Sequence, residues 1–318
     1  MSKQLNQEQR YQLYRMNNMG LKQIEMAEIL SVSPSTVSRE LRRNTGKRGT
    51  YIKEAHQLAR QRRYIAQPRI SDSDWKIVKQ YLELDFSPEQ ISNWLKRWNI
   101  LNVSTQWIYH YIQTNKRKGR SLSTHLRCKK KNRKIYGSKW RSQSISDRIS
   151  ITERPEYVNN RERYGDWEVD TMIGRQGGKV LVTLVERKSK LSLIGLSKDK
   201  TSQAVKETLL ELLGSISHQV HILTYDNGSE FAKHKEIDEA FNCQAYFARP
   251  YCSGDRGLSE NTNGLIRQYL PKGISFDSLP KKMTIWIMNR LNNRPRKTLN
   301  YQTPNEVFWG KPKIAFGS

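Results

Sequence analysis

Apolar residues in the first 45 positions recur at helical spacing, and short polar turns separate the runs. The spacing predicts helices over residues 7–18, 21–30 and 34–43. Ser33 is a good helix cap and Pro34 suits a first helical position, so the third helix is expected to begin at this pair. A short helix, a tight turn and a second helix with a polar outer face are typical of a helix-turn-helix, whose second helix enters the major groove of DNA.

The same spacing predicts which faces of these helices are buried. In the second helix the predicted inward positions are Leu21, Ile24, Ala27 and either Glu28 or Ile29. In the third helix Val37 and Leu41 point inward. The outward residues of the third helix are Ser35, Thr36, Ser38, Arg39, Arg42 and Arg43. A merely solvated helix would mix Glu with Lys, whereas Glu40 is the one acid here, so we predict that this face binds DNA.

A second set of helical patterns follows. Helices are predicted over residues 72–84, 88–98 and 105–113. Ser87 and Gln90 have the spacing of a capping box, with Pro88 at the first helical position. Ile108 and Ile112 give the last helix an apolar stripe. We interpret this region as a second helix-turn-helix, and the alternative is a helical hairpin that packs on the first one.

Beyond residue 164 the pattern changes to strands alternating with helices. Strands are predicted over residues 167–173, 180–187, 191–197, 220–225 and 245–248. Helices are predicted over residues 202–216, 237–241 and 259–269. This order favours an α/β layer with a mixed sheet.

The net charge of the chain indicates which class of molecule it binds. The 318 residues include 56 Lys and Arg against 30 Asp and Glu, a formal net charge of +26. Residues 1–150 hold 31 basic and 11 acidic residues, a difference of +20, and residues 151–318 hold 25 and 19, a difference of +6. A strongly basic first half indicates a polyanion, most simply nucleic acid. The absence of a long apolar run, of a signal peptide and of more than 3 Cys argues against a membrane or secreted protein.

Two cationic runs, at residues 116–120 and 129–134, lie between the two regions. Charge runs are often only solvated, but in a DNA-binding chain we expect phosphate contacts, in particular from Lys129, Lys130 and Lys131.

Candidate catalytic groups are carboxylates at the ends of predicted strands and at a helix start. Asp170 shares its strand face with Asp166 and Glu168, and alternation cannot choose among these three. Asp226 follows the fourth strand, and Glu260 lies in the first turn of a helix. Phosphodiester cleavage needs charge neutralised at attacking and leaving oxygens, which two Mg²⁺ ions held by carboxylates provide.

Simpler roles exist for the same residues. Asp226 could cap a turn and Glu260 could favour the helix dipole. His218, His221, Cys243 and Cys252 could form a zinc site, but they lack a paired-cysteine motif and the two histidines fall on opposite strand faces. His234 is near enough to Asp226 in sequence to support it from behind.

Several separated motifs resemble the insertion-sequence-thirty family of prokaryotic DDE transposases. They are residues 33–41, 165–170, 225–231, 260–269, 293–297 and 301–308, in this order along nearly the whole chain. Two departures are Val169, where the family usually has Gly, and the segment 252–255, where it commonly has Trp and Gln. In this segment Asp255 adds an acid near the expected substrate.

The resemblance implies an RNase H-like catalytic core, a mixed sheet flanked by helices and preceded by all-α helix-turn-helix domains. It assigns the acidic triad to Asp170, Asp226 and Glu260, which would hold two Mg²⁺ ions, with Mn²⁺ able to substitute. Arg267, seven positions and about 10.5 Å after Glu260 along one helix face, matches a basic residue that would hold a DNA phosphate. Asn261 and His234 are expected to support the site from behind.

The resulting expectation is an insertion-sequence transposase. It would bind terminal inverted repeats, cleave the element ends and join the 3′-hydroxyl to target DNA, as a homodimer or higher oligomer on double-stranded DNA, without a membrane partner. We expect it in the prokaryotic cytoplasm, at the nucleoid. The alternatives are an inactive DNA-binding regulator and an RNase H-like nuclease that does not join.

The predicted division of the chain follows from these elements. Residues 1–46 form a helix-turn-helix domain, 47–70 a linker, 71–115 a second helical domain, 116–163 a basic linker, 164–310 the catalytic core and 311–318 a tail.

Overall fold

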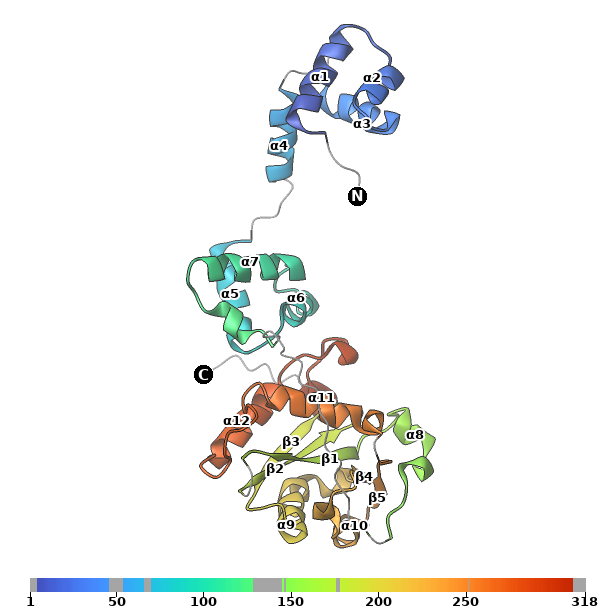
Figure 1. The fold of residues 1–318 in the computed structure, drawn as a ribbon, viewed down its shortest axis with the longest axis vertical. Coiled ribbons are helices and arrows are strands. Elements are labelled where there is room, and N and C mark those ends of the chain that lie inside the picture. The colour runs from blue at the N-terminus through green and yellow to red at the C-terminus, as the bar shows by residue number, and fades with distance from the viewer. Residues whose placement is uncertain are drawn as a thin grey trace. The chain divides into compact units, whose positions relative to one another are not determined.

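The computed structural model describes residues 5–45, 54–65, 70–127, 145, 147–175, 178–250 and 252–310. The chain divides into two compact units, Met1–Ser71 and Asp72–Ser318, whose elements are labelled in Figure 1. Lys129, Lys130 and Lys131 lie outside the described residues, so the phosphate contacts predicted for them remain a prediction. Among the described residues no helix is both long and apolar enough to span a bilayer.

The first unit is a small helical bundle. Its helices are α1 (Gln7–Asn18), α2 (Gln23–Ile29), α3 (Pro34–Asn44) and α4 (Ala55–Ile65). Ser33 caps α3 by accepting a hydrogen bond from the Thr36 N–H, and Pro34 takes the first position, as predicted. Leu13, Met26 and Val37 are almost fully buried in a common core, so α1, α2 and α3 pack by the burial of one apolar face each.

The buried face of α2 differs from the prediction. Ile24 is 63% exposed and Ile29 61% exposed, whereas Met26, Ala27 and Leu30 are buried. The helix spans only seven residues. Two turns contain too few apolar positions to fix the rotation of a helix by spacing, so its neighbours decide which side is covered.

Glu40 is also placed differently. It is buried and pairs with Arg10 of α1, and Asn44 donates to the same carboxylate at 2.9 Å. The exposed face of α3 therefore has no acid.

Residues 47–70 were predicted as a linker, and most of the described part of this segment is helix α4. His56 lies beside Arg10 at 3.2 Å, and Arg62 donates to the Arg43 carbonyl at 2.9 Å. Helix α4 therefore packs against the ends of the helix-turn-helix.

The second unit begins with three more helices, α5 (Asp72–Glu83), α6 (Pro88–Arg97) and α7 (Thr105–Arg117), followed by the 3₁₀ turn η1 (Leu122–His125). The capping box of Ser87 and Gln90 is present. Ile91, Leu95 and Ile108 are completely buried. These predicted elements are confirmed.

This helical part contacts the α/β part of the same unit. Arg97 pairs with Glu306 at 3.0 Å, and the Tyr269 hydroxyl donates to Asp85 at 3.0 Å. Gln90 donates to the Pro295 carbonyl at 2.7 Å. Polar contacts therefore connect α5–α7 to the α/β part.

The α/β part is a five-stranded sheet in the order β3-β2-β1-β4-β5. Its strands are β1 (Asp166–Ile173), β2 (Val180–Glu186), β3 (Ser192–Ser197), β4 (Ile222–Tyr225) and β5 (Gln244–Phe247). The first three strands are antiparallel, and β4 and β5 run parallel to β1. This is the predicted mixed sheet of an RNase H-like core, which is confirmed.

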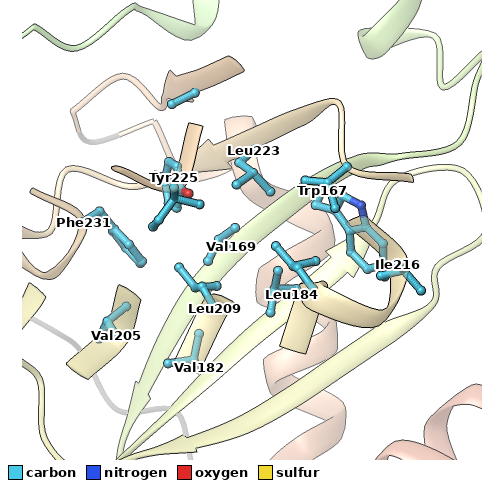
Figure 2. Packing of buried hydrophobic residues seen from close by; sticks show 14 of the residues in the cluster. Trp167, Val169, Val182, Leu184, Val205, Leu209, Ile216, Leu223, Tyr225 and Phe231 are labelled. Carbon is cyan, nitrogen blue, oxygen red and sulfur yellow. The ribbon is translucent and has the colours of Figure 1, made fainter. Parts of the chain in front are cut away.

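Helices cover both faces of the sheet (Figure 1). They are α9 (Ser202–Leu213) and α10 (His234–Phe241) on one face and α11 (Gly257–Ile266) and α12 (Lys281–Asn292) on the other. Figure 2 shows the first face, where Val169 of β1 and Leu184 of β2 pack with Leu209 of α9. Alternate residues of β1 point to the opposite face, toward α11.

A sharp turn precedes β1. Gly165 has a φ of +92°, and its carbonyl accepts the His221 N–H at 2.8 Å. A Cβ at this position would lie 2.8 Å from the Gln219 carbonyl oxygen. Glycine is therefore required both by its backbone conformation and by the close approach of the chain.

The remaining elements are short. They are η2 (Ile151–Glu153), α8 (Glu156–Asn159), η3 (Gly214–Gln219), η4 (Ser229–Phe231), η5 (Ser253–Arg256), η6 (Lys297–Leu299) and α13 (Pro304–Trp309). Residues 116–163 were predicted as a basic linker, yet Val158 of α8 packs on Ile222 and Tyr246 of the sheet. The described end of that segment is therefore part of the α/β core.

Candidate active site

Helix α11 runs alongside β1 and holds its acidic residues in place. The Ser259 N–H donates to Glu168 Oε2 at 3.0 Å, and Asn263 Nδ2 donates to Asp170 Oδ2 at 2.8 Å. Thr183 of β2 donates to Asn263 Oδ1 at 3.0 Å, which orients the amide so that its NH₂ faces Asp170. Successive turns of one helix thus contact successive inward residues of one strand.

Asp170 and Asp226 come together where β1 lies next to β4. The parallel register pairs Glu168 with Thr224, so two residues further on both aspartates stand at the same level. Arg256 lies between them, with Nη1 3.2 Å from Asp170 Oδ1 and Nη2 3.4 Å from Asp226 Oδ2. One guanidinium therefore serves two carboxylates. The sequence pattern did not single out Arg256.

Backbone N–H groups fix the inner oxygens of both acids. The Thr171 N–H donates to Asp170 Oδ1 and the Gly228 N–H donates to Asp226 Oδ1, each at 2.9 Å. A Cβ on Gly228 would lie 2.9 Å from Asp226 Oδ1 and still closer to a Glu230 oxygen. The glycine in the Asp-Asn-Gly turn is thus needed because two carboxylates crowd it.

The pKa values of both aspartates reflect this crowding. Burial raises the pKa of Asp170, Arg256 opposes that rise, and the charge of Asp226 adds to it. Burial likewise raises the pKa of Asp226, with Arg256 opposing and Glu230 adding to it. Such a site favours an additional cation, because a cation stabilises the ionised form of both acids.

Glu230 is a further carboxylate that the sequence pattern did not select. It is 3% exposed, accepts the Thr171 hydroxyl at 2.7 Å and pairs with Lys200 at 3.1 Å. Its second oxygen is buried with no hydrogen-bond partner among the described residues. In the sequence Glu230 is only a second acid four residues after Asp226, and nothing there indicates that it is buried.

Glu260 lies apart from this pair. It is exposed, in the first turn of α11. Asn263 stands three residues after it, so these two residues lie on one face of the helix. No three Asp, Glu, His or Cys side chains within the described ranges meet closely enough to hold one metal ion. The structure thus brings two of the three predicted acids together, whereas Glu260 is exposed on α11, three residues before the Asn263 that contacts Asp170.

The competing acids of β1 already have cationic partners. Asp166 pairs with Arg163 at 3.0 Å and is fully buried. Glu168 pairs with Arg187 and accepts the Ser259 N–H. Of the three acids on this strand face, Asp170 is the one whose arginine partner, Arg256, also pairs with Asp226.

The other predicted site residues have different surroundings. His234 is buried, with Nδ1 3.3 Å from the Phe231 carbonyl and its ring against Phe247, and burial lowers its pKa. Asn261 is exposed, with Oδ1 3.5 Å from Arg127. Neither contact involves Asp170 or Asp226.

Arg267 and the altered loop also make local contacts. Arg267 donates to the Ile173 carbonyl at 2.7 Å, so part of its guanidinium fastens α11 to the end of β1. Asp255 does not stand free near the site, because Arg249 pairs with it at 2.8 Å. The thiol of the proposed zinc ligand Cys243 lies 3.5 Å from Asp238 Oδ1.

The polar face of α3 is the other candidate site. Ser35, Ser38, Arg39, Arg42 and Arg43 are exposed, and Thr36 is half-buried because its hydroxyl bonds Ser33 at 2.8 Å. The capped N-terminus of the helix and these side chains form an exposed polar surface with three arginines. Such a surface fits a DNA groove.

The fold and these two sites define a protein with a helix-turn-helix and an acidic α/β core. Residues 2–44 match a family described as helix-turn-helix domain. The chain is 39% identical to the transposase for insertion sequence element IS4351 of Bacteroides fragilis, covering 97% of this chain and 96% of that one. It is 36% identical to the IS1086 transposase of Cupriavidus metallidurans (94% and 91%) and 32% identical to the IS30A transposase InsI of Escherichia coli (89% and 77%).

Solved structures with partial likeness include the catalytic core domain of BIV integrase (TM-score 0.37, 18% identity, 46% of this chain and 95% of that one). Another is the HTLV-2 integrase catalytic core domain in complex with magnesium (TM-score 0.34, 20% identity, 44% and 94%). The relatives cover nearly the whole length at more than 30% identity. The chain therefore belongs to the insertion-sequence-thirty family of transposases.

Proposed function

We propose that this chain is the transposase of an insertion sequence, which binds the terminal inverted repeats, cleaves the element ends and joins the 3′-hydroxyl to target DNA. The observation that carries the proposal is the pair of Asp170 and Asp226, held at one level of the sheet by a single guanidinium. A chain whose relatives along its length are transposases needs an acidic site for phosphoryl transfer, and this pair supplies two of its acids.

The donor set suits Mg²⁺. The converging atoms are carboxylate oxygens, which hard divalent ions prefer, and the place between them already accommodates a cationic group, that of Arg256. Asp170 and Asp226 would hold one ion and Asp170 and Glu260 a second, with Mn²⁺ as a substitute. Bound there, the ions would neutralise charge on the attacking and leaving oxygens.

The chain's own residues prepare this site. Asn263 and the Thr171 N–H each donate to one oxygen of Asp170 and so fix the orientation of its carboxylate. The Gly228 N–H does the same for Asp226. Arg256 keeps the two acids ionised and close in the resting protein, so little rearrangement is needed when the DNA strand arrives.

DNA recognition falls to the first unit. The N-terminal turn of α3 would enter the major groove, where Arg39 reads a base edge and Arg42 and Arg43 contact phosphates. Arg267 and Lys129–Lys131 would add phosphate contacts near the core. Two element ends must be joined to one target, so a homodimer or higher oligomer is expected, acting at the nucleoid in a prokaryotic cytoplasm.

The proposed domains are those given by the sequence pattern: residues 1–46 for terminal recognition, 71–115 as a second helix-turn-helix-like domain and 164–310 as the catalytic core. The segments 47–70 and 116–163 would connect them, with helix α4 added to the first domain and α8 added to the core, because these helices pack there. Residues 311–318 would be a tail.

The direct test is Asp226→Asn, which keeps the size of the side chain and removes its charge. We expect binding to DNA from the element ends to be retained and Mg²⁺-dependent cleavage to be abolished. Cleavage at the wild-type rate would refute the role of Asp226. An inactive regulator predicts that the wild type does not cleave either. A nuclease that only hydrolyses predicts no joined product when pre-cut 3′-hydroxyl ends are incubated with plasmid.

A further inference from the structure

A cavity of about 420 Å³ is lined in part by the segment before helix α11 that also carries Arg256. Residues Gly254, Asp255 and Gly257 of that loop line it, together with Glu168 of β1. Its most prominent feature is a set of four arginines from separate segments: Arg154, Arg161, Arg187 and Arg249. The carboxylate pair and the cavity therefore share one loop and neighbouring residues of one strand.

Two of these arginines belong to the protein interior. Arg154 is 7% exposed and Arg187 6% exposed. Arg154 donates to the neutral oxygens of Asn159 at 3.1 Å and Thr224 at 2.9 Å. Arg187 pairs with Glu168, which also accepts hydrogen bonds from Ser259. Burying arginines is costly, and the neutral partners of Arg154 orient its charge without cancelling it.

The acids in the cavity wall do not balance the four arginines. Glu168 serves Arg187 and Asp255 serves Arg249 at 2.8 Å, which leaves the charges of Arg154 and Arg161 in excess. Burial and the neighbouring Arg187 lower the pKa of Arg154 to about 10. Arg161 also lowers the pKa of Arg187. These like charges oppose one another, and an anion in the cavity would relieve that repulsion.

The start of helix α11 adds backbone N–H groups to the cavity wall. Gly257 and Leu258 line the cavity and begin α11, a helix of ten residues. Of the first-turn N–H groups, that of Ser259 goes to Glu168. The N-terminal end of the helix dipole therefore points at the same space as the guanidinium groups, which favours an anion.

We propose that this cavity binds a phosphate group of the DNA strand that passes the carboxylate pair. Guanidinium forks match phosphate oxygens in pairs. Glu168 of the cavity wall stands two residues before Asp170 on β1, and the lining loop carries Arg256, so the cavity adjoins the segments that hold the carboxylate pair, as a neighbouring phosphate on the same strand requires. This inference rests on the proposed function, because it takes the bound strand to be the one that is cleaved or joined.

The first experiment tests whether the cavity binds an anion when no DNA is present. The melting temperature of the full-length protein is measured in inorganic phosphate and in chloride at the same ionic strength. We expect phosphate to stabilise the wild type by several degrees and this gain to be lost in Arg154→Lys and Arg161→Gln. Arg161 is exposed, so its variant keeps the test valid if Arg154→Lys folds poorly. Arg175→Gln, which removes an exposed arginine beyond the far end of β1, is the control.

The second experiment asks whether the anion belongs to DNA. The affinity of Arg161→Gln for element-end duplex is measured over a range of salt concentrations. We expect the slope of log affinity against log salt to become shallower by about 0.9, the change expected when one DNA phosphate is no longer neutralised. Arg175→Gln should keep the wild-type slope.

Each result has a definite meaning. Phosphate stabilisation that persists in both pocket variants would overturn the site. Loss of phosphate stabilisation with an unchanged salt slope would assign the cavity to a free anion and overturn its assignment to DNA. Failure of the wild type to cleave would instead count against the proposed function, and the thermal measurement does not depend on cleavage.

Discussion

The acids of the DNA-reading bundle and those of the acidic core differ in how completely their charge is balanced by neighbouring groups. In the bundle, Glu40 is matched by Arg10 and Asn44, and its charge is fully used inside the fold. In the core, Asp170 and Asp226 share one guanidinium. A third acid, Glu230, is buried and keeps one oxygen without a partner among the described residues. The first arrangement is structural, and the second leaves a deficit of positive charge that a cation can fill.

The largest expected effect breaks the matched pair of the bundle. Replacing Arg10 with Ala leaves the Glu40 carboxylate buried without its counterion, which costs about 3–5 kcal/mol. Amide hydrogen exchange of α1 and α3 in the full chain reports the free energy of unfolding of this unit. Arg15→Ala, which removes an exposed arginine of the same helix, should cost less than about 0.5 kcal/mol. Equal losses in both variants would show that the pair is not what stabilises the bundle.

The next effect concerns the shared guanidinium of the core. Arg256→Gln without divalent metal leaves two neighbouring carboxylates uncompensated, and we expect a loss of roughly 1–3 kcal/mol at pH 7. Added Mg²⁺ should raise the melting temperature of this variant more than that of the wild type, because a bound cation replaces the missing charge. Arg148→Gln, which removes an exposed arginine bound to Asn227, is the matched control. An equal Mg²⁺ response in the wild type and Arg256→Gln would contradict the counterion role.

The pH dependence of the same variant sharpens this comparison. The folded pKa of each aspartate is raised above its ordinary value of 3.8. The folded state therefore binds more protons, so stability falls as pH rises from 3.8 toward the folded pKa. Removing Arg256 raises both pKa values further, so the decline should extend to higher pH than in the wild type. Melting temperatures between pH 3.5 and pH 8 measure this, and parallel curves would contradict it.

Sequence patterns predict the elements of both regions and fail where side chains from distant segments meet. The strands of the sheet and the caps at Ser33 and Ser87 follow from local chemistry, and the structure has them. The rotation of α2 was wrong because seven residues contain too little periodic signal. Helix α4 was missed for a related reason, since its polar sequence is stabilised by contacts with Arg43 and other residues of the bundle.

The candidate site likewise contains residues that the sequence could mark and residues that only the folded structure reveals. The position of Asp226 after a strand and before Asn-Gly marked it in the sequence, and the motif resemblance chose Asp170 over its neighbours. Asp166 and Glu168 each have an arginine partner that is not shared with Asp226, whereas the arginine of Asp170 is shared with Asp226. These contacts depend on Arg163, Arg187 and Arg256, which no alternation can predict. Arg256 and Glu230 were missed because their roles depend on contacts with distant segments. Arg256 contacts Asp170 and Asp226, and Glu230 contacts Thr171.

An effect on binding, with no loss of stability expected, tests base reading by the bundle. Arg39→Ala should reduce the preference for element-end DNA over random duplex by about 1–3 kcal/mol, since a base edge loses its hydrogen-bond partner while the fold keeps its core. Competition binding at one salt concentration measures the preference. Arg62→Ala, which removes an arginine that donates to the Arg43 carbonyl, tests whether a structural change of this bundle has the same effect. Equal losses on specific and random duplex for Arg39→Ala would remove it from base recognition.

The smallest expected change in specificity comes from the cationic run Lys129–Lys131. Replacing the three lysines with Ala should weaken binding to specific and random DNA by the same factor, because phosphate contacts carry no sequence information. The salt dependence of both should become shallower by up to about 2.7, that is about 0.9 for each phosphate that a lysine no longer neutralises. This outcome would distinguish neutralisation of the DNA phosphates by the lysines from the base reading proposed for α3. A loss confined to element-end DNA would instead make the run part of the recognition surface, and the division of labour between reading and charge neutralisation would have to be redrawn.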